Sequence, residues 1–205
     1  MNPILDLETL RRAAAAGDTL VYRLFWGHRA RKDGQLGDAC FSQWWRCRFI
    51  VNEQMYSSAE HFMMAAKARL FGDETTRTAI LAAADPGAAK SLGRKVRGFE
   101  PTVWDAARFD IVTAGNVAKF GQDDRLRAYL LATGDEILVE ASPVDAVWGI
   151  GLPAAHADAR TPERWPGQNL LGFALMRARG ILRGELPGID GATNGDVPDA
   201  HLQPC

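Results

Sequence analysis

The chain has 205 residues, a length that fits a single domain of ordinary size. Its hydrophobic fraction of 47% and charged fraction of 24% are those of an ordinary globular protein, which argues against a disordered or fibrous chain. The net charge of −1 excludes a strong overall field for attracting a polyanion, so any phosphate must be bound by local groups.

The cysteines and the first residues indicate a reducing compartment. Cys40, Cys47 and Cys205 form neither an even disulfide set nor a CxxC pair, and we interpret them as reduced thiols. The start of the chain lacks the basic and apolar blocks of a secretory signal. No apolar run approaches the ~20 residues of a membrane span. We therefore expect a cytoplasmic protein with no membrane contact.

The first part of the chain predicts one peripheral helix and a small β element. Residues 5–16 combine good helix formers with early acids and late arginines, and Gly17 stands at the stop position. Asn52 and Glu53 can form the turn of a hairpin. Short apolar or β-branched runs, which predict strands, occupy residues 20–25, 46–51 and 54–56.

From residue 59 onward the pattern is mainly helical. Apolar residues recur at three-to-four-residue spacing from Ala59 to Leu70, and Asp85 followed by Pro86 marks another helix start. Further helices are predicted from Pro101 to residue 118 and over residues 126–132 and 168–183, with a strand at residues 137–139.

We therefore expect a mainly α fold with a small β element, arranged as one compact domain over residues 20–186. An N-terminal extension of residues 1–19 precedes it. Residues 187–205, rich in glycine, proline and aspartate, are predicted to be a disordered tail.

The first candidate motif is YSSAEHFMMAAKARLFGD, residues 56–73, which places Glu60 on the first turn of a helix. Ser57-x-x-Glu60 has the spacing of a capping box, and on this fragment alone that structural role is favoured over a catalytic one. His61 and Lys67 carry the same two interpretations, as structural helix residues or as ligand-binding groups.

The second motif is the loop ASPVDAVWGIGL, residues 141–152. Its glycines, Gly149 among them, allow backbone amides to approach a ligand, and Trp148 offers a flat face for a base or a ribose. Asp145 can equally cap a turn, and Trp148 can equally belong to the core. On this loop alone the two interpretations are even.

Aromatic residues flank a polar stretch in FWGH, residues 25–28, and CFSQWW, residues 40–45. They suit a pocket rim, which makes Trp26 and Gly27 candidates for substrate binding, although tryptophans that anchor strands against helices are the more ordinary explanation. Basic residues that suit a phosphate clamp, and equally a solvated helix face, are Lys90, Arg94, Lys95 and Lys119.

Several common site motifs are absent from the sequence. It contains no GxxxxGK[ST] phosphate loop, no GxGxxG after a strand, no HExxH and no GxSxG. The four histidines and three cysteines are scattered, with none at zinc-ligand spacing. We therefore predict a site built on carboxylates, with no metal and no cofactor.

Taken together, these segments resemble the NADAR or YbiA family. The family shows, in order, F-x-G-H, a Tyr-x-[Ser/Thr]-x-Glu-His helix start with a later lysine, Lys-x-Leu-Gly-Arg, Trp…Lys-Phe-x-Gln, Leu-x-x-Thr-Gly-Asp, Val-Glu-Ala-Ser-Pro-x-Asp-x-x-Trp-Gly-Ile-Gly-Leu, and Asn-Leu-Leu-Gly-x-Ala-Leu-Met. The matching blocks lie at residues 25–28, 56–67, 90–94, 104–122, 130–135, 139–152 and 169–176. Such an ordered series is far more specific than any one block, and it spans residues 20–183.

The resemblance implies a compact, YbiA-like helical fold and N-glycosidase activity on base ribosides. The family's Glu-His pair coincides with Glu60 and His61, so the resemblance favours Glu60 as the catalytic residue, with Asp145 as the other carboxylate. Substrate-binding candidates are Trp26, Gly27, His61, Lys67, Arg94, Trp104, Lys119, Trp148, Gly149 and Asn169. Family members often carry Pro-Thr before x-Glu-His, where this chain has Ser57-Ser58. If Ser58 is the N-cap, Glu60 leaves the capping-box position and is free to face a ligand.

We therefore expect an N-glycosidase that hydrolyses the bond between a ribosyl phosphate and a nitrogenous base. The resemblance makes ribosylamino-pyrimidine intermediates of riboflavin biosynthesis the first candidate substrates. One alternative is a glycohydrolase that removes ADP-ribose from guanine in nucleosides or nucleic acid, against which the near-neutral charge argues weakly. An alternative of another class is a non-catalytic module that binds ADP-ribose or NAD derivatives.

Overall fold

The computed structural model describes residues 3–189, and the chain within this range is mainly helical, with four short strands. The expected mainly α fold with a small β element is therefore confirmed. The tail predicted for residues 187–205 falls, from residue 190 on, outside the described residues. Within residues 3–189, every helix is too short or too polar to cross a bilayer.

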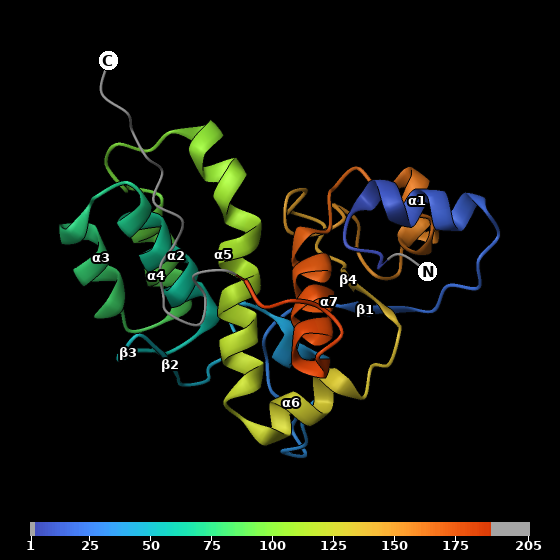
Figure 1. Ribbon diagram of the computed structural model, residues 1–205, viewed down its shortest axis with the longest axis horizontal. Helices are drawn as coiled ribbons and strands as arrows, with labels where there is room; N and C mark the ends of the chain where they lie inside the picture. Colours follow the sequence, from blue (N-terminus) through green and yellow to red (C-terminus); the bar gives the residue numbers. More distant parts are fainter. Residues whose placement is uncertain (1–2, 190–205) are drawn as a thin grey trace.

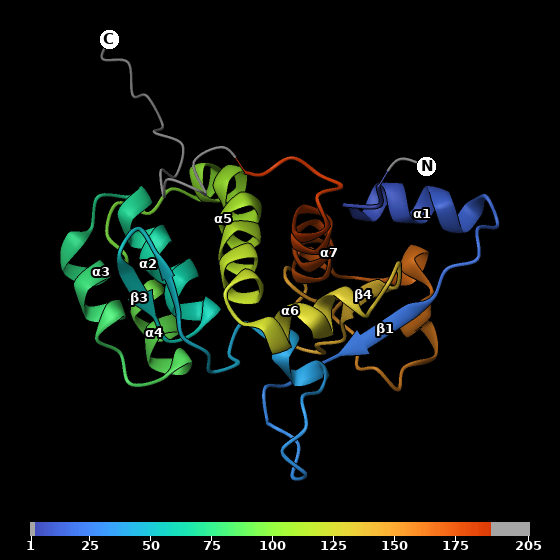
Figure 2. The ribbon, with the colours of Figure 1, turned by 60° about the horizontal axis from the view of Figure 1, so that its bottom comes forward.

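The predicted hairpin is present as β2 (Phe49–Val51) and β3 (Gln54–Tyr56), which pair antiparallel. Asn52 and Glu53 form its turn with φ values of 48° and 61°. Left-handed conformations at both central positions are typical of a type I′ turn, whose twist matches that of the flanking strands. Figure 2 shows the hairpin lying beside the helix formed by residues 59–70.

The second strand pair joins distant parts of the chain. β1 (Tyr22–Phe25) pairs in parallel with β4 (Ile137–Glu140), so that Phe25 lies opposite Glu140. The sequence predicted both strands but not their pairing, because local periodicity carries no information about which strands meet. This pairing fixes the position of the last residue of β4, from which a functional loop starts.

Two helix groups surround these strands (Figure 1). On one side lie α2 (Ala59–Leu70), α3 (Glu74–Leu81) and α4 (Pro86–Gly93), and on the other α7 (Leu170–Arg183) packs on β4. The long helix α5 (Pro101–Gly121) stands between the groups and contacts both α2 and α7. The loop after β4 crosses over to this interface.

Small residues allow α2 to approach its neighbours closely. A Cβ atom added at Gly93 of α4 would lie 2.1 Å from Sδ of Met64, and one at Gly115 of α5 would lie 2.6 Å from the Phe62 ring. Both distances are far below van der Waals contact, so a larger residue would require the Met64 and Phe62 side chains, or the helices themselves, to shift. The glycines thereby allow α2 to pack closely against α4 and α5.

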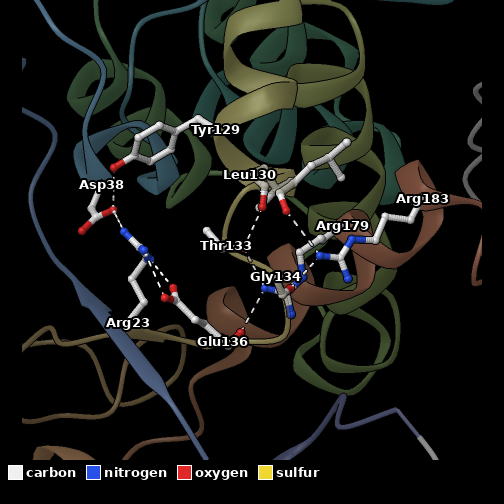
Figure 3. A network of polar contacts seen from close by, with 10 residues as sticks. Arg23, Asp38, Tyr129, Leu130, Thr133, Gly134, Glu136, Arg179 and Arg183 are labelled. Atoms are coloured by element: carbon white, nitrogen blue, oxygen red, sulfur yellow. Dashed lines mark hydrogen bonds and ion pairs between the residues drawn. The ribbon is translucent and has the colours of Figure 1, made fainter.

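The other half of the molecule is joined by polar contacts, shown in Figure 3. Arg23 of β1 pairs with Glu136 and, at 3.1 Å, with Asp38. Tyr129 of α6 (Asp124–Leu131) donates to the same Asp38 oxygen at 2.9 Å. Arg179 of α7 donates to the Glu136 carbonyl at 3.0 Å. These bonds hold β1, α6 and α7 in one rigid unit.

The N-terminal helix α1 (Leu7–Ala15) packs against residues 162–164. Its Leu10 is fully buried, and Arg11 donates from Nε to the Pro162 carbonyl at 2.9 Å. Pro162 begins the 3₁₀ turn η3 (Pro162–Arg164), which follows η2 (Ala157–Arg160); a third 3₁₀ turn, η1 (Asp38–Phe41), follows β1. The extension predicted at residues 1–19 thus contributes a side chain to the core.

Candidate active site

A pocket of about 660 Å³, including its open mouth, lies where α2, α4 and α5 meet the loop after β4. Its walls combine acidic, basic and aromatic side chains with a few apolar ones. The lining residues are Ser42, Gln43, Trp44, Glu60, Met63, Met64, Lys67, Lys90, Gly93, Arg94, Trp104, Glu140, Asp145, Trp148 and Leu171. Six of the residues expected in the site from the sequence therefore lie in one pocket: Glu60, Lys67, Arg94, Trp104, Asp145 and Trp148.

Helix capping decides the role of Glu60. The N-cap of α2 is Ser58, whose hydroxyl accepts from the backbone N–H of His61 at 3.3 Å. Glu60 is therefore the second helical residue, outside the capping-box position, and its own N–H donates to the Gln43 carbonyl at 3.0 Å. The capping-box interpretation, which Ser57 as N-cap would require, does not hold in this structure.

The Glu60 carboxyl is buried without a full set of partners. The residue is 2% exposed, and Oε1 has no hydrogen-bond partner. Burial raises the pKa of Glu60 to about 7, against the opposing effects of the Lys90 charge and a hydrogen bond from Trp44. The group therefore changes charge near neutral pH, which suits acid–base chemistry there.

Asp145 both caps a turn and faces the pocket. Its Oδ1 accepts backbone N–H groups of Val147 at 2.9 Å and Trp148 at 2.8 Å. The two interpretations that the sequence left open are thus compatible. Gly149 packs on the chain itself, since a Cβ there would lie 2.7 Å from the carbonyl oxygen of Glu140. Its lack of a side chain lets the loop close on the end of β4.

Three cationic side chains border the acids. Lys67 lies 4.0 Å from the Phe99 ring centroid and 5.5 Å from that of Trp104, and burial lowers its pKa. Lys90 lies 5.9 Å from the Trp44 ring centroid, and Arg94 is exposed at the end of α4. Cations beside flat aromatic faces suit an anionic group attached to a ring-containing ligand.

Lys119, predicted to hold phosphate, lies outside the pocket lining. It is 1% exposed, and Nζ donates to the carbonyls of Cys40 at 2.6 Å and Ser42 at 2.9 Å. Its ammonium group therefore already donates hydrogen bonds to two backbone oxygens. Ser42 lines the pocket, so Lys119 contacts the backbone of one wall from the side away from the ligand space.

Four other expected residues also lie outside the lining. His61 is buried, with Nδ1 2.7 Å from the Ser58 hydroxyl and Nε2 3.1 Å from the Ala83 carbonyl. Asn169 joins α7 to β4, while Trp26, which is 60% exposed, and Gly27 belong to the segment that projects beyond β1 (Figure 2). Asn169 thereby contacts the backbone of Glu140, which lines the pocket, whereas His61 contacts Ser58 and Ala83, which do not.

Several lining residues were not selected from the sequence, among them Glu140, Trp44 and Gln43. Glu140 ends an apolar strand, and an acidic residue at such a position could have been selected as a candidate from the sequence. Trp44 and Gln43 lie in the CFSQWW segment, whose aromatic residues were noted only as a group. Among residues 3–189, no group of three or more His, Cys, Asp or Glu side chains has the arrangement of a metal site.

Comparison with known proteins places the chain in a family. The family model described as NADAR domain matches residues 24–183, which is most of the chain. The chain belongs to the NADAR domain family. N-glycosidase R617 of Acanthamoeba polyphaga mimivirus is 47% identical over 157 residues, covering 74% of this chain and 92% of that protein.

Further relatives agree with this assignment. The NMR structure of the E. coli protein YbiA superposes with a TM-score of 0.61 at 27% identity, covering 82% of this chain and 89% of that one. Riboflavin biosynthesis protein VVA0006 of Vibrio vulnificus is 32% identical over 69% of this chain, which matches 35% of that longer protein. The predicted family is confirmed, as is the enzyme class, a hydrolase of N-glycosyl bonds.

Proposed function

We propose that this NADAR protein hydrolyses the bond between a ribosyl phosphate and a nitrogenous base, with Glu60 as the principal catalytic carboxylate. The observation that carries the proposal is the buried Glu60 oxygen without a partner, which faces a pocket bordered by aromatic and cationic side chains. An unpaired buried polar atom costs about 1–3 kcal/mol, so its retention calls for an explanation.

The chemistry of an N-riboside explains the need for such a group. As the C1–N bond breaks, positive charge grows on the sugar and negative charge on the departing base. An ionised Glu60 stabilises the cation and accepts a proton from the attacking water. Asp145, on the adjacent loop, is the candidate for binding a sugar hydroxyl or orienting that water.

The remaining lining residues divide between the base and the phosphate. Trp104 and Trp148 offer flat faces on which a base can stack. Lys90 and Arg94, both on α4, supply the donors that a phosphate needs, and Lys67 lies on the opposite helix α2. A ligand with a ring at one end and a phosphate at the other fits this division.

The first candidate substrates are ribosylamino-pyrimidine phosphates of the riboflavin pathway. The relative named Riboflavin biosynthesis protein VVA0006 supports this choice. A second candidate is ADP-ribose attached to guanine, favoured by the presence of three cations, Lys67, Lys90 and Arg94, where a single phosphate needs fewer. A module that only binds such ligands has no use for a buried unpaired carboxyl.

The test is to incubate the purified protein with both classes of riboside and to follow the released base by mass spectrometry. We expect release from one class, and its loss in Glu60→Gln. The matched control is Glu53→Gln, which makes the same chemical change in the exposed hairpin turn. Absence of a released base from every riboside, with a folded protein, would contradict the proposal.

A further inference from the structure

A second pocket acid, Glu140, has no role in the proposed function so far. It is the last residue of β4 and lines the same pocket as Glu60. Its Oε2 is buried and, like Oε1 of Glu60, has no hydrogen-bond partner. Two carboxyl groups with buried unpaired oxygens therefore face one space.

The backbone of Glu140 is held on both sides. Its N–H donates to Oδ1 of Asn169 at 2.9 Å, and its carbonyl accepts from Ser142 and Ile150, each at 2.9 Å. Asn169 is itself fixed, because its side-chain N–H donates to the Leu138 carbonyl at 2.9 Å. The fold thus places the Glu140 side chain rigidly while leaving its carboxyl available.

The charged groups that face Glu140 come from three elements: Glu60 from α2, Lys90 from α4 and Asp145 from the loop after β4. Burial, followed by Asp145, raises the pKa of Glu140 to about 8, and the Lys90 charge opposes this rise. Glu60 has a pKa of about 7. Of the two carboxyl groups, Glu140 therefore keeps its proton to the higher pH.

Asp145 is less suited to donate a proton than Glu140. Its Oδ1 already accepts two backbone N–H groups, from Val147 and Trp148, and these bonds hold the side chain in the turn. Glu140 Oε2 has no such donor, so in the protonated form it can donate to a ligand atom. Pairs of acids whose surroundings differ in this way commonly divide acid and base roles.

We propose that Glu140 is the general acid of this site and donates its carboxyl proton to the departing base. The inference rests on the proposed N-glycosidase function. As the C1–N bond breaks, the base nitrogen takes the Glu140 proton; water adds to C1 and gives a proton to Glu60. Transfer of that proton from Glu60 to Glu140, directly or through solvent, restores both groups, so the net change is addition of one water.

The experiment compares wild type with Glu140→Gln on two ribosides of different leaving group. A neutral base, as in a ribosylamino-pyrimidine phosphate, needs a proton to depart, whereas the pyridinium of nicotinamide mononucleotide departs as a neutral molecule. We expect the variant to lose about 100-fold or more in kcat on the neutral base and less than about threefold on nicotinamide mononucleotide. Glu53→Gln is the control for removing an exposed charge.

The pH profile of kcat is the second measurement, and it decides alone if wild type does not accept nicotinamide mononucleotide. In wild type the rate on the neutral base should fall above about pH 8 as Glu140 loses its proton. In Glu140→Gln this fall should disappear and leave a low rate that is flat at high pH. If Glu140 had a purely structural role, its replacement would lower the rate but would leave the fall above about pH 8 in place.

Three results would overturn the proposal. Wild-type rates in Glu140→Gln, or an unchanged alkaline limb, would remove Glu140 from the proton transfer while leaving the proposed function intact. Equal losses of kcat on both ribosides would show that Glu140 does not donate a proton to the departing base. Failure of wild type on every riboside would overturn the proposed function and the role of Glu140 together.

Discussion

Two regions of the molecule bury charged side chains in opposite ways. On the α6–α7 side, Arg179 is 5% exposed and donates to the Thr133 hydroxyl at 2.8 Å and the Glu136 carbonyl at 3.0 Å. Behind the pocket, Lys119 is likewise matched by two carbonyls. In the pocket itself, buried oxygens of Glu60 and Glu140 have no partner. Burial alone therefore does not mark a functional group; the candidates are the buried groups that line the pocket and lack partners.

A third unpaired atom supports this distinction. Among the described residues, the buried side-chain atoms without a partner are Oε1 of Glu60, Oε2 of Glu140 and Oδ1 of Asn116. Asn116 lies directly behind the pocket, where its Nδ2 donates to Oε1 of Gln43 at 3.2 Å. The unsatisfied groups thus gather at the pocket, as expected of a region selected for activity over stability.

Glu60→Gln should give the largest effect. It keeps the size of the side chain but removes the charge that a growing sugar cation feels, so we expect turnover to fall by about 100-fold or more. Substrate binding, measured by calorimetry, should persist. The parallel variant Asp145→Asn compares the two carboxylates. Near-full activity in Glu60→Gln, with loss in Asp145→Asn, would transfer the principal role to Asp145.

Lys119→Met should lower the stability of the protein and leave its activity nearly unchanged. Removing the ammonium group leaves a buried carbonyl of Cys40 without its donor, which costs about 1–3 kcal/mol in the free energy of unfolding. We expect turnover per folded molecule to stay within about threefold of wild type. Denaturant unfolding of this variant and of the exposed control Lys32→Met measures the free energy of unfolding. Turnover assays on both variants measure the activity per folded molecule.

Lys90→Gln should weaken substrate binding moderately. We expect KM for a phosphorylated riboside to rise about tenfold, since a charge-assisted contact to phosphate is lost. The Lys90 charge also lowers the pKa of Glu60, so its removal should shift the acidic limb of the pH profile to higher pH. Lys95→Gln, at an exposed position outside the pocket, is the control. An unchanged KM and an unchanged limb would exclude Lys90 from both roles.

Truncation after Leu186 should have the smallest effect. Leu186 is retained because it packs near Gly180, whereas the composition of the following residues offers little apolar area for burial. We expect unchanged turnover and an unchanged melting temperature. A large fall in melting temperature would show that the tail stabilises the domain.

Much of the fold was accessible from local patterns. The hairpin followed from its β-branched runs and the Asn52-Glu53 turn, and the start of α4 from Asp85 and Pro86. The parallel pairing of β1 with β4 was not accessible, because it depends on packing between segments far apart in the chain. Helix α3 was missed because its sequence, ETTRTAIL, is polar and rich in threonine, a poor helix former.

The same limit applied to the site. Their acidic side chains, together with the sequence blocks shared with the NADAR family, indicated Glu60 and Asp145, and both residues line the pocket. Lys119 was expected to hold phosphate because a cation on a helix looks the same in sequence whether it meets a ligand or a carbonyl. Glu140 was missed although it ends an apolar strand, because its unpaired buried oxygen is a property of the folded chain.

The most direct test of the central claim is the stability of wild type and Glu60→Gln as a function of pH. Burial raises the folded-state pKa of Glu60 to about 7, above its ordinary value of 4.5. The folded state therefore binds this proton more tightly, and the associated stability, present below pH 4.5, is lost as pH rises through 7.

Glutamine carries no charge at any pH and escapes this loss. At about 1.4 kcal/mol for each unit of pKa change, Glu60→Gln should be more stable than wild type by up to about 3 kcal/mol at pH 8. At pH 5 the two should differ little. The expected result is an inactive variant with a higher melting temperature at pH 8. A lower melting temperature at pH 8 would contradict the account, because it would mean that the Glu60 carboxylate is stabilised by partners in the folded protein.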